Sequence, residues 1–199
     1  MAITTVIFDL GGVVCGFRPE RRLAALAAAC DLPPEAIQQC IWGSGFDADC
    51  DRGRFTATEV YEQARQMLGL RMPYAGFRAA WVAAFEPDVD VLALVDRLRP
   101  RLRTALLTDN GPVLRDALPA LLPEVAHRFD PLLFSCDLGA LKPSREAFAT
   151  ALDRLETPAE RTLLIDDAPA NVEGARACGM AAFRFTSVAD LASALRRLL

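Results

Sequence analysis

Short apolar runs alternate with helical patterns along much of this chain, and each run ends in a small or polar residue. Runs that are apolar at successive positions are typical of parallel strands covered by helices on both faces. The expected strands occupy residues 4–8, 104–108, 131–135, 162–166 and 181–185. Strands and helices that alternate in this way predict an α/β fold with a doubly wound parallel sheet.

The first expected strand is followed by a long stretch that breaks this alternation. The next strand begins near residue 104, far later than a single crossover helix requires. Helical patterns fill the gap at residues 19–29, 34–42, 56–70 and 74–85, and residues 88–99 return to the sheet. Thr56 and Glu59 have the spacing of a capping box. We therefore predict a core domain of residues 1–17 and 89–199, with a helical cap of residues 18–88 inserted after the first strand.

Composition narrows the class of partner. Hydrophobic residues make up 52% of the 199 residues and charged residues 24%, which indicates a folded globular protein. The formal net charge of −4 disfavours nucleic acid and anionic membranes, because both attract basic surfaces. No apolar run approaches the roughly 20 residues that span a bilayer. The six cysteines include no C-x-x-C pair, which fits reduced thiols, so we expect a cytoplasmic protein that binds a small molecule.

Polar residues stand at the ends of the expected strands or in the loops that follow. Asp9 follows the first strand, Thr108 ends the second, and Asp166 and Asp167 mark the end of the fourth. Lys142 lies in the loop after the third. In an open parallel sheet, ligands bind outside the carboxyl ends of the strands. Carboxylates, a hydroxyl and an ammonium group at one edge can hold a cation and a phosphate.

The segments that carry these residues resemble the motifs of the haloacid dehalogenase-like (HAD) hydrolase superfamily. "VIFDLGGVV" resembles the first motif and contains Asp9, and "ALLTDNG" resembles the second and contains Thr108. "LGALKPSREAF" resembles the third, with Lys142, and "LLIDDAPANVEGARACGM" resembles the fourth, with Asp166 and Asp167. The resemblance extends from end to end. It implies a HAD-like Rossmannoid core with an inserted helical cap.

This resemblance implies a hydrolase of phosphoric monoesters that uses Mg²⁺ and forms an aspartyl-phosphate. It implies that Asp9 is the nucleophile and binds the metal together with Asp167 and the backbone carbonyl of Gly11. A carboxylate can attack phosphorus when a cation screens the repulsion between two anions. Asp166 is expected to orient Lys142 or a water molecule. The expected catalytic residues are Asp9, Lys142, Thr108 and Asp166.

A phosphate ester needs further contacts. Thr108 and nearby backbone N–H groups are expected to bind the phosphate, and Lys142 is expected to balance its charge. The expected substrate-binding residues are Thr108, Asp109, Asn110, Lys142, Arg18 and Arg52. The alternative for Asp109 and Asn110 is that they only shape the turn. Arg18 and Arg52 could equally be solvated surface residues.

Gly11 departs from the motif of most phosphatases in the superfamily. Those enzymes usually carry a second aspartate there, which protonates the leaving group and later activates water. General acid–base help of this kind is typically worth about 10²- to 10⁴-fold in rate. The chain resembles a branch whose first motif is Asp-Leu-Gly-x-Val and which includes a phosphatase of α-glucose 1-phosphate, so the resemblance implies a substrate of the sugar phosphate class. A metal-held water, Asp47, Asp49 or Asp51 could replace the missing acid.

Two other functions stay open. A metal-free 2-haloacid dehalogenase would also use Asp9 as nucleophile. Such dehalogenases usually carry an aromatic residue at the position of Gly11, and an arginine about thirty residues after the nucleophile, where residues 30–40 contain none. The second alternative is a catalytically silent HAD-like domain that binds a ligand, and the absent acid at Gly11 is its supporting feature.

Overall fold

A five-stranded parallel sheet forms the centre of the protein. The structure is a computed structural model that describes residues 2–198, so Met1 and Leu199 of the predicted core lie outside the described residues. The strands are β1 (Thr5–Phe8), β4 (Arg103–Thr108), β5 (Leu132–Phe134), β6 (Thr162–Asp166) and β7 (Ala181–Arg184). Their order is β5-β4-β1-β6-β7, and every neighbouring pair is parallel. The α/β fold with a doubly wound parallel sheet is confirmed.

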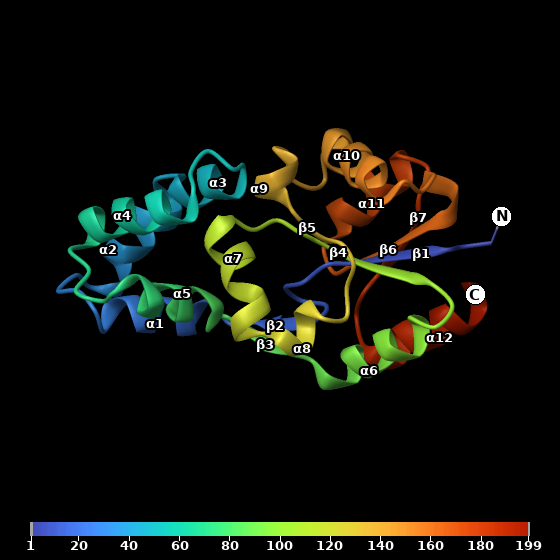
Figure 1. Ribbon diagram of the computed structural model, residues 1–199, viewed down its shortest axis with the longest axis horizontal. Helices are drawn as coiled ribbons and strands as arrows, with labels where there is room; N and C mark the ends of the chain where they lie inside the picture. The colour runs from blue at the N-terminus through green and yellow to red at the C-terminus, as the bar shows by residue number, and fades with distance from the viewer. Residues whose placement is uncertain (1, 199) are drawn as a thin grey trace.

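Helices cover both faces of this sheet (Figure 1). On one face lie α10 (Arg145–Leu155) and α11 (Pro169–Ala177), and on the other α6 (Val89–Leu98) and α12 (Val188–Leu198). Ile7 belongs to the apolar cluster that contains Phe148 of α10, whereas Val6 and Phe8 belong to the cluster that contains Leu191 of α12. Successive side chains of a strand point to opposite faces, so a strand buried on both sides is apolar throughout.

The other helices belong either to the part of the molecule that contains the sheet or to a second part that consists mainly of helices, called the helical part below. Beside the sheet lie α7 (Pro112–Leu121), α8 (Pro123–Ala126), α9 (Ser135–Leu138) and η2 (Ala159–Arg161). The helical part contains α1 (Pro19–Ala27), α2 (Pro34–Gln38), the π-helical η1 (Gln39–Gly43), α3 (Phe46–Asp51), α4 (Ala57–Leu68) and α5 (Tyr74–Val82). Within residues 2–198, no helix is both long and apolar enough to cross a membrane.

The predicted start of α4 is confirmed in atomic detail. The Thr56 hydroxyl accepts a hydrogen bond from the Glu59 backbone N–H at 3.3 Å, and the Glu59 carboxylate accepts one from the Thr56 N–H at 2.8 Å. These reciprocal bonds satisfy two donors that a helix start leaves free. The single helix expected at residues 34–42 is instead α2 followed by η1, and α3 was not expected.

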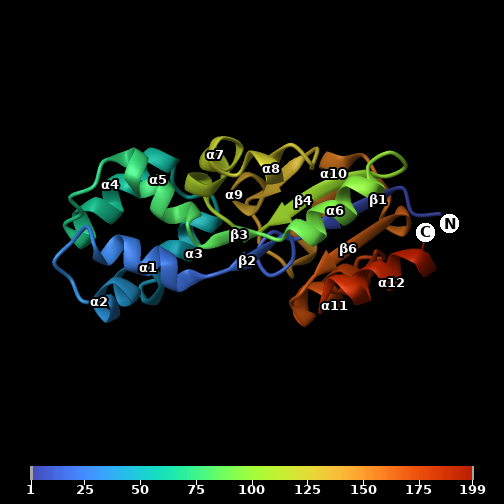
Figure 2. The ribbon, with the colours of Figure 1, turned by 90° about the horizontal axis from the view of Figure 1, so that it is seen from below.

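A short antiparallel ribbon joins the two parts of the molecule. Strand β2 (Cys15–Phe17) pairs with β3 (Phe85–Pro87), and the rings of Phe17 and Phe85 lie 5.3 Å apart. The helix expected through residue 85 therefore ends at Val82, because Phe85 pairs with a strand distant in sequence. Both passages of the chain between the parts run through this ribbon (Figure 2). We propose that residues 18–88 form a cap domain and residues 1–17 and 89–199 the core.

Candidate active site

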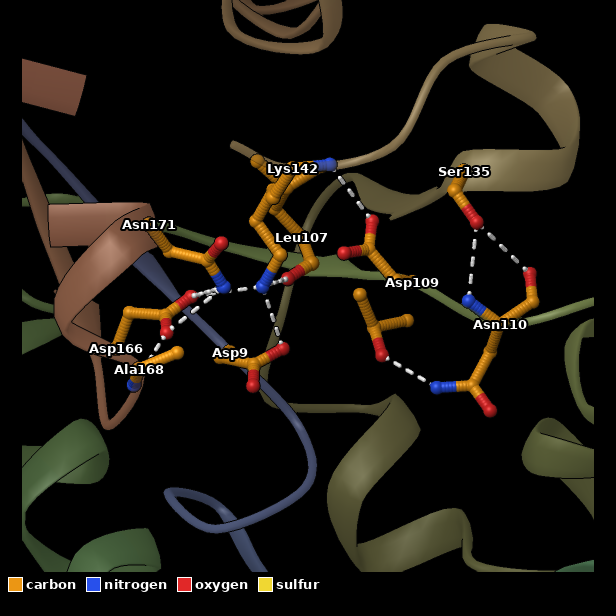
Figure 3. A network of polar contacts seen from close by, with 10 residues as sticks. Asp9, Leu107, Asp109, Asn110, Ser135, Lys142, Asp166, Ala168 and Asn171 are labelled. Carbon is orange, nitrogen blue, oxygen red and sulfur yellow. Dashed lines mark hydrogen bonds and ion pairs between the residues drawn. The ribbon is translucent and has the colours of Figure 1, made fainter. Parts of the chain in front are cut away.

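The polar residues expected at the strand ends meet at one edge of the sheet (Figure 3). The Lys142 ammonium donates hydrogen bonds to Asp9 Oδ1 and to Asp166 Oδ2, each at 2.8 Å. It also donates to the carbonyl oxygen of Leu107 at 3.2 Å. An ammonium group has three donors, and these three acceptors use all of them. The loop before α10 thus places Lys142 between the ends of β1, β4 and β6.

Lys142 is a buried cation, 7% exposed. Burial by itself lowers the pKa of Lys142, but the charges of Asp9, Asp166 and Asp109 outweigh it and raise the pKa, so the group stays charged. It is also the single lysine among the 22 basic residues of the chain. A compact ammonium can face three acceptors in different directions, which a planar guanidinium fits less well. A single lysine in a chain whose other basic residues are arginines is a feature of the sequence that indicates Lys142 without the structure.

Asp9 faces this cation from the end of β1. It is 9% exposed, and burial raises its pKa to about 6, while the charge of Lys142 lowers it and the charge of Asp166 adds to the rise. The second oxygen of its carboxylate points away from Lys142 (Figure 3). Asp9 also lines the cavity described below. It is therefore a carboxylate held in place through one oxygen and open to a ligand.

The two neighbouring acids after β6 have different surroundings. Asp166 is fully buried and accepts hydrogen bonds from Asn171 Nδ2 at 3.0 and 3.1 Å and from the Ala168 N–H at 2.9 Å, besides its bond from Lys142. Asp167 is exposed and lines the cavity. Asp166 is thus positioned to hold Lys142 and the start of α11, and Asp167 is free for a ligand.

The acids form a cluster that could hold a metal ion. Carboxylate oxygens of Asp9, Asp166 and Asp167 lie within 4.8 Å of one another. Because the oxygens of Asp166 already accept several hydrogen bonds, Asp9 and Asp167 are the better ligands. Hard oxygen donors of this kind suit Mg²⁺. The residues present therefore fit the metal that the sequence implied.

The loop between Asp9 and β2 has one glycine that the site requires. Gly12 has a φ of +83°, and a Cβ atom there would lie 2.5 Å from Asp167 Oδ2. Gly11 lines the cavity, and a Cβ atom there would make ordinary contacts with Phe85 at 3.5 Å and Phe17 at 3.7 Å. Thus Gly12 lets the Asp167 carboxylate approach the loop, while position 11 has room for a Cβ atom.

Replacing Gly12 by alanine should weaken Mg²⁺ binding. The added methyl group collides with the Asp167 carboxylate, so we expect the Kd for Mg²⁺, measured by calorimetry, to rise about tenfold or more, which is about 1.4 kcal/mol. Gly139→Ala is the matched control, because Gly139 also has a positive φ of 72° but nothing lies within 4 Å of its Cβ position. An unchanged Kd in Gly12→Ala, or an equal rise in both variants, would contradict this reasoning.

The turn after β4 lies beside the lysine. Asn110 Nδ2 donates to the Thr108 hydroxyl at 2.7 Å, and Asp109 Oδ1 accepts the Lys142 backbone N–H at 3.1 Å. Burial raises the pKa of Asp109. Thr108, Asp109 and Asn110 all line the cavity. The Ser135 hydroxyl, which the sequence did not single out, accepts the Asn110 N–H at 3.0 Å and fixes this turn.

A cavity of about 630 Å³ lies between this edge of the sheet and the helical part. Arg18 and Arg52 do not line it: both are exposed, with Arg18 3.9 Å from Glu86 and Arg52 3.8 Å from Asp49. The arginine in its wall is Arg22 instead. The residues of the helical part and the ribbon that line it are Phe17, Pro19, Glu20, Arg22, Leu23, Gln38, Trp42, Asp47, Asp51 and Phe85.

Arg22 is 4% exposed and was not predicted. Its Nε donates to the carbonyl oxygen of Trp81 at 3.0 Å, and its guanidinium lies 4.4 Å from the centre of the Trp81 ring. Burial lowers the pKa of Arg22 to about 10, so it stays charged at neutral pH. Arg22 and Leu26 are both buried and stand four residues apart on α1. A position on the apolar stripe of that helix is the signal that could have identified it.

Three comparisons relate this chain to known proteins. A family model described as haloacid dehalogenase-like hydrolase matches residues 3–179. Bifunctional epoxide hydrolase 2 of Mus musculus is 34% identical over 219 residues, covering 100% of this chain and 38% of that protein's length. Phosphatase MT3486 of Mycobacterium tuberculosis is 28% identical over 191 residues, covering 92% of this chain and 87% of that protein.

A solved structure shares the fold. The HAD family enzyme bt-2542 of Bacteroides thetaiotaomicron, in complex with magnesium and inorganic phosphate, superposes with a TM-score of 0.76 at 20% identity, over 93% of this chain and 95% of that chain. The residues that the family model matches include Asp9, Thr108, Lys142 and Asp166. This protein belongs to the haloacid dehalogenase-like hydrolase family.

Proposed function

We propose that this hydrolase is a Mg²⁺-dependent phosphatase that acts on a small phosphate ester of the sugar phosphate class. The observation that carries the proposal is the contact of Lys142 with Asp9 and Asp166, beside Asp167 and at the wall of a cavity. The acid cluster at this edge suits a metal ion, which a metal-free dehalogenase does not use. A name that includes phosphatase, in a relative matched over most of both chains, also supports phosphate chemistry.

Each residue of the site has a definite task in this reaction. Asp9 attacks the phosphorus atom and becomes an aspartyl-phosphate, and water later releases inorganic phosphate. Lys142 keeps Asp9 ionised and balances the charge of the phosphate. The Thr108 hydroxyl and nearby backbone N–H groups hold the phosphate oxygens. Asp9, Asp167 and the backbone carbonyl of Gly11 would hold Mg²⁺, which neutralises phosphate charge when bound.

The size and lining of the cavity favour a sugar phosphate. A volume of about 630 Å³ is within the range of pockets that bind small molecules. Trp42, Phe17 and Phe85 offer aromatic surface, and Asp47 and Asp51 offer carboxyl groups that can hydrogen-bond to hydroxyls. This mixture suits a ring with one apolar face and several hydroxyl groups.

Hydrolysis of p-nitrophenyl phosphate tests the proposal. We expect turnover in Mg²⁺, loss of at least nine-tenths of it in EDTA, and recovery when Mg²⁺ is restored in excess. This ester has a good leaving group, so an enzyme without an acid at position 11 should still cleave it. A panel of sugar phosphates under the same conditions would then identify the substrate.

Two outcomes would overturn the proposal. Chloride release from 2-chloropropionate in EDTA, with no phosphatase activity, would identify a dehalogenase. Calorimetric binding of Mg²⁺ and phosphate, without turnover of any ester in the panel, would identify a silent binding domain.

A further inference from the structure

Cleavage of an ester with a poor leaving group needs a proton donor, and Gly11 has no side chain to supply one. We propose that Asp51, at the end of α3, gives a proton to the leaving-group oxygen and so replaces the side chain that Gly11 lacks. This inference rests on the phosphatase function proposed above. Donation by a positioned acid is worth about 10²- to 10⁴-fold in rate.

Helix α3 directs two of its acids into the cavity. Asp47 and Asp51 are four residues apart, which places them on one face of a helix. Both line the cavity that also contains Asp9, Lys142 and Thr108. The intervening acid, Asp49, pairs with Arg54 at 3.1 Å and does not line the cavity. Of the three acids that the sequence left as candidates, Asp49 is therefore set aside.

The backbone at Asp51 is fastened to the strand ends of the core. The Ser135 hydroxyl, at the end of β5, donates to the Asp51 carbonyl oxygen at 2.7 Å. The turn after α3 approaches the segment after β5 even more closely, because a Cβ atom at Gly53 would overlap with the carbonyl oxygen of Cys136. On the other side, a Cβ atom at Gly111 would lie 3.2 Å from Cys50. These contacts hold the backbone at Asp51 beside the turn that begins with Thr108.

Asp51 shares the cavity wall with a second acid and one buried cation. Arg22 is buried in the cavity wall, and its Nη2 has no hydrogen-bond partner among the residues that the structure describes. The charge of Arg22 acts on both Asp47 and Asp51. Two half-buried carboxyl groups beside one cation repel each other when both are ionised, which disfavours loss of both protons.

Asp51 is the acid whose pKa rises above neutrality. Burial raises the pKa of Asp51 to about 8, with the charges of Asp47 and Asp109 adding to the rise and that of Arg22 opposing it. Burial also raises the pKa of Asp47, but the charge of Arg22 and the Trp42 side chain oppose it. Of the two acids, Asp51 is therefore the one that we assign as the proton donor.

The proposed proton transfers balance over the two half-reactions. An Asp9 oxygen bonds to phosphorus, the bond from phosphorus to the leaving-group oxygen breaks, and that oxygen takes the proton of Asp51 to leave as an alcohol. The Asp51 carboxylate then takes a proton from a water molecule whose oxygen bonds to phosphorus. The bond between phosphorus and the Asp9 oxygen breaks, inorganic phosphate leaves, and Asp51 again holds a proton.

The test compares two aryl esters that differ in the basicity of the leaving group. Phenyl phosphate releases a phenol whose pKa is near 10, like that of tyrosine, whereas p-nitrophenol is far more acidic and needs little protonation. We expect Asp51→Asn to lower kcat/KM for phenyl phosphate about 10²-fold or more, and to lower it for p-nitrophenyl phosphate by a factor at least tenfold smaller. The control Asp49→Asn makes the same carboxyl-to-amide change on the same helix but outside the cavity, and should stay within about twofold of wild type on both esters.

The possible outcomes separate this inference from the phosphatase proposal. If the wild type cleaves neither ester, the proposed function fails and this inference fails with it. If the wild type is active and Asp51→Asn loses the same factor on both esters, or on neither, Asp51 is not the donor. The wild type alone gives a second test, because an enzyme with its own acid should cleave the two esters at similar rates, and a steep preference for the nitrophenyl ester would overturn the inference.

A second variant tests whether proton donation is what Asp51→Asn loses. Position 11 has room for a Cβ atom and lines the same cavity. Gly11→Asp in the Asp51→Asn background should therefore recover at least tenfold of the lost activity towards phenyl phosphate, with little change towards p-nitrophenyl phosphate. Circular dichroism and competitive inhibition by inorganic phosphate check that each variant is folded with its site intact. Equal recovery on both esters would contradict the assigned role.

Discussion

Asp9→Asn is expected to abolish the turnover of p-nitrophenyl phosphate, with kcat/KM at least about 10⁴-fold below that of the wild type. An amide of the same shape cannot attack phosphorus as a carboxylate does. Its oxygen can still accept the hydrogen bond that Lys142 donates to Asp9 Oδ1 at 2.8 Å, so the site should keep its structure. Steady-state kinetics in excess Mg²⁺, with protein purified separately from the wild type, measure the loss.

Asp167→Asn is the control that separates the nucleophile from the metal ligand. Asp167 is exposed at the cavity and makes no contact with Lys142 of the kind that Asp9 makes. Loss of a metal ligand alone should be partly recovered by raising the Mg²⁺ concentration. Loss of the nucleophile should not be recovered at any Mg²⁺ concentration. Residual activity above about one per cent in Asp9→Asn, or its recovery at high Mg²⁺, would remove Asp9 from the chemistry.

The strand-end residues could be predicted because topology alone brings them together. Asp9, Thr108 and Asp166 each stand where a buried apolar run stops, and parallel strands place those stops at one edge. Lys142 comes from a loop, and its position followed from the motif and not from any strand. The family resemblance inferred from these segments is confirmed.

The residues that line the cavity from the helical part could not be predicted in the same way. Arginine is mostly exposed in proteins, and the burial of Arg22 depends on the packing of α1 against Trp81 of α5, far away in sequence. By residue type, Arg18 and Arg52 were equally plausible as substrate-binding residues, but at their positions the side chains are exposed to solvent. Ser135 matters through its bond to the Asp51 carbonyl oxygen, a contact between residues 84 apart. Such contacts exist only after the two parts have packed.

The mechanism that we propose divides the chemistry between two parts of the chain. In that mechanism the sheet edge supplies the nucleophile, the cation and the oxygen ligands, and all of these are close to strand ends. The helical part supplies Arg22, Asp47 and Asp51, which line the same cavity. If Asp51 is the acid, the residue that discriminates among leaving groups belongs to the part of the chain that also encloses them. Specificity and proton donation would then depend on the same cavity wall.

Lys142→Met is expected to lower both stability and activity. The substitution keeps a long, unbranched side chain but leaves Asp9 and Asp166 without their shared cation in a buried site. Removing one partner of a buried ion pair typically costs about 3–5 kcal/mol, and the free energy of unfolding in urea without Mg²⁺ should fall by about that amount. The deficit should shrink as the pH falls towards 4, because protonation removes the unbalanced negative charge, and it should be largest near pH 7.

Lys142→Arg separates charge from geometry. A guanidinium keeps the positive charge but cannot easily reach Asp9, Asp166 and the Leu107 carbonyl oxygen at once, because its donors lie in one plane. We expect this variant to recover part of the lost stability at pH 7 while its kcat remains at least about 10²-fold below that of the wild type. If Lys142→Met unfolds at the same urea concentration as the wild type, the ammonium is not what holds the two carboxylates at the sheet edge. Near-normal kcat in Lys142→Arg would show that charge alone suffices, and that the three-way contact is not needed to keep Asp9 aimed at phosphorus.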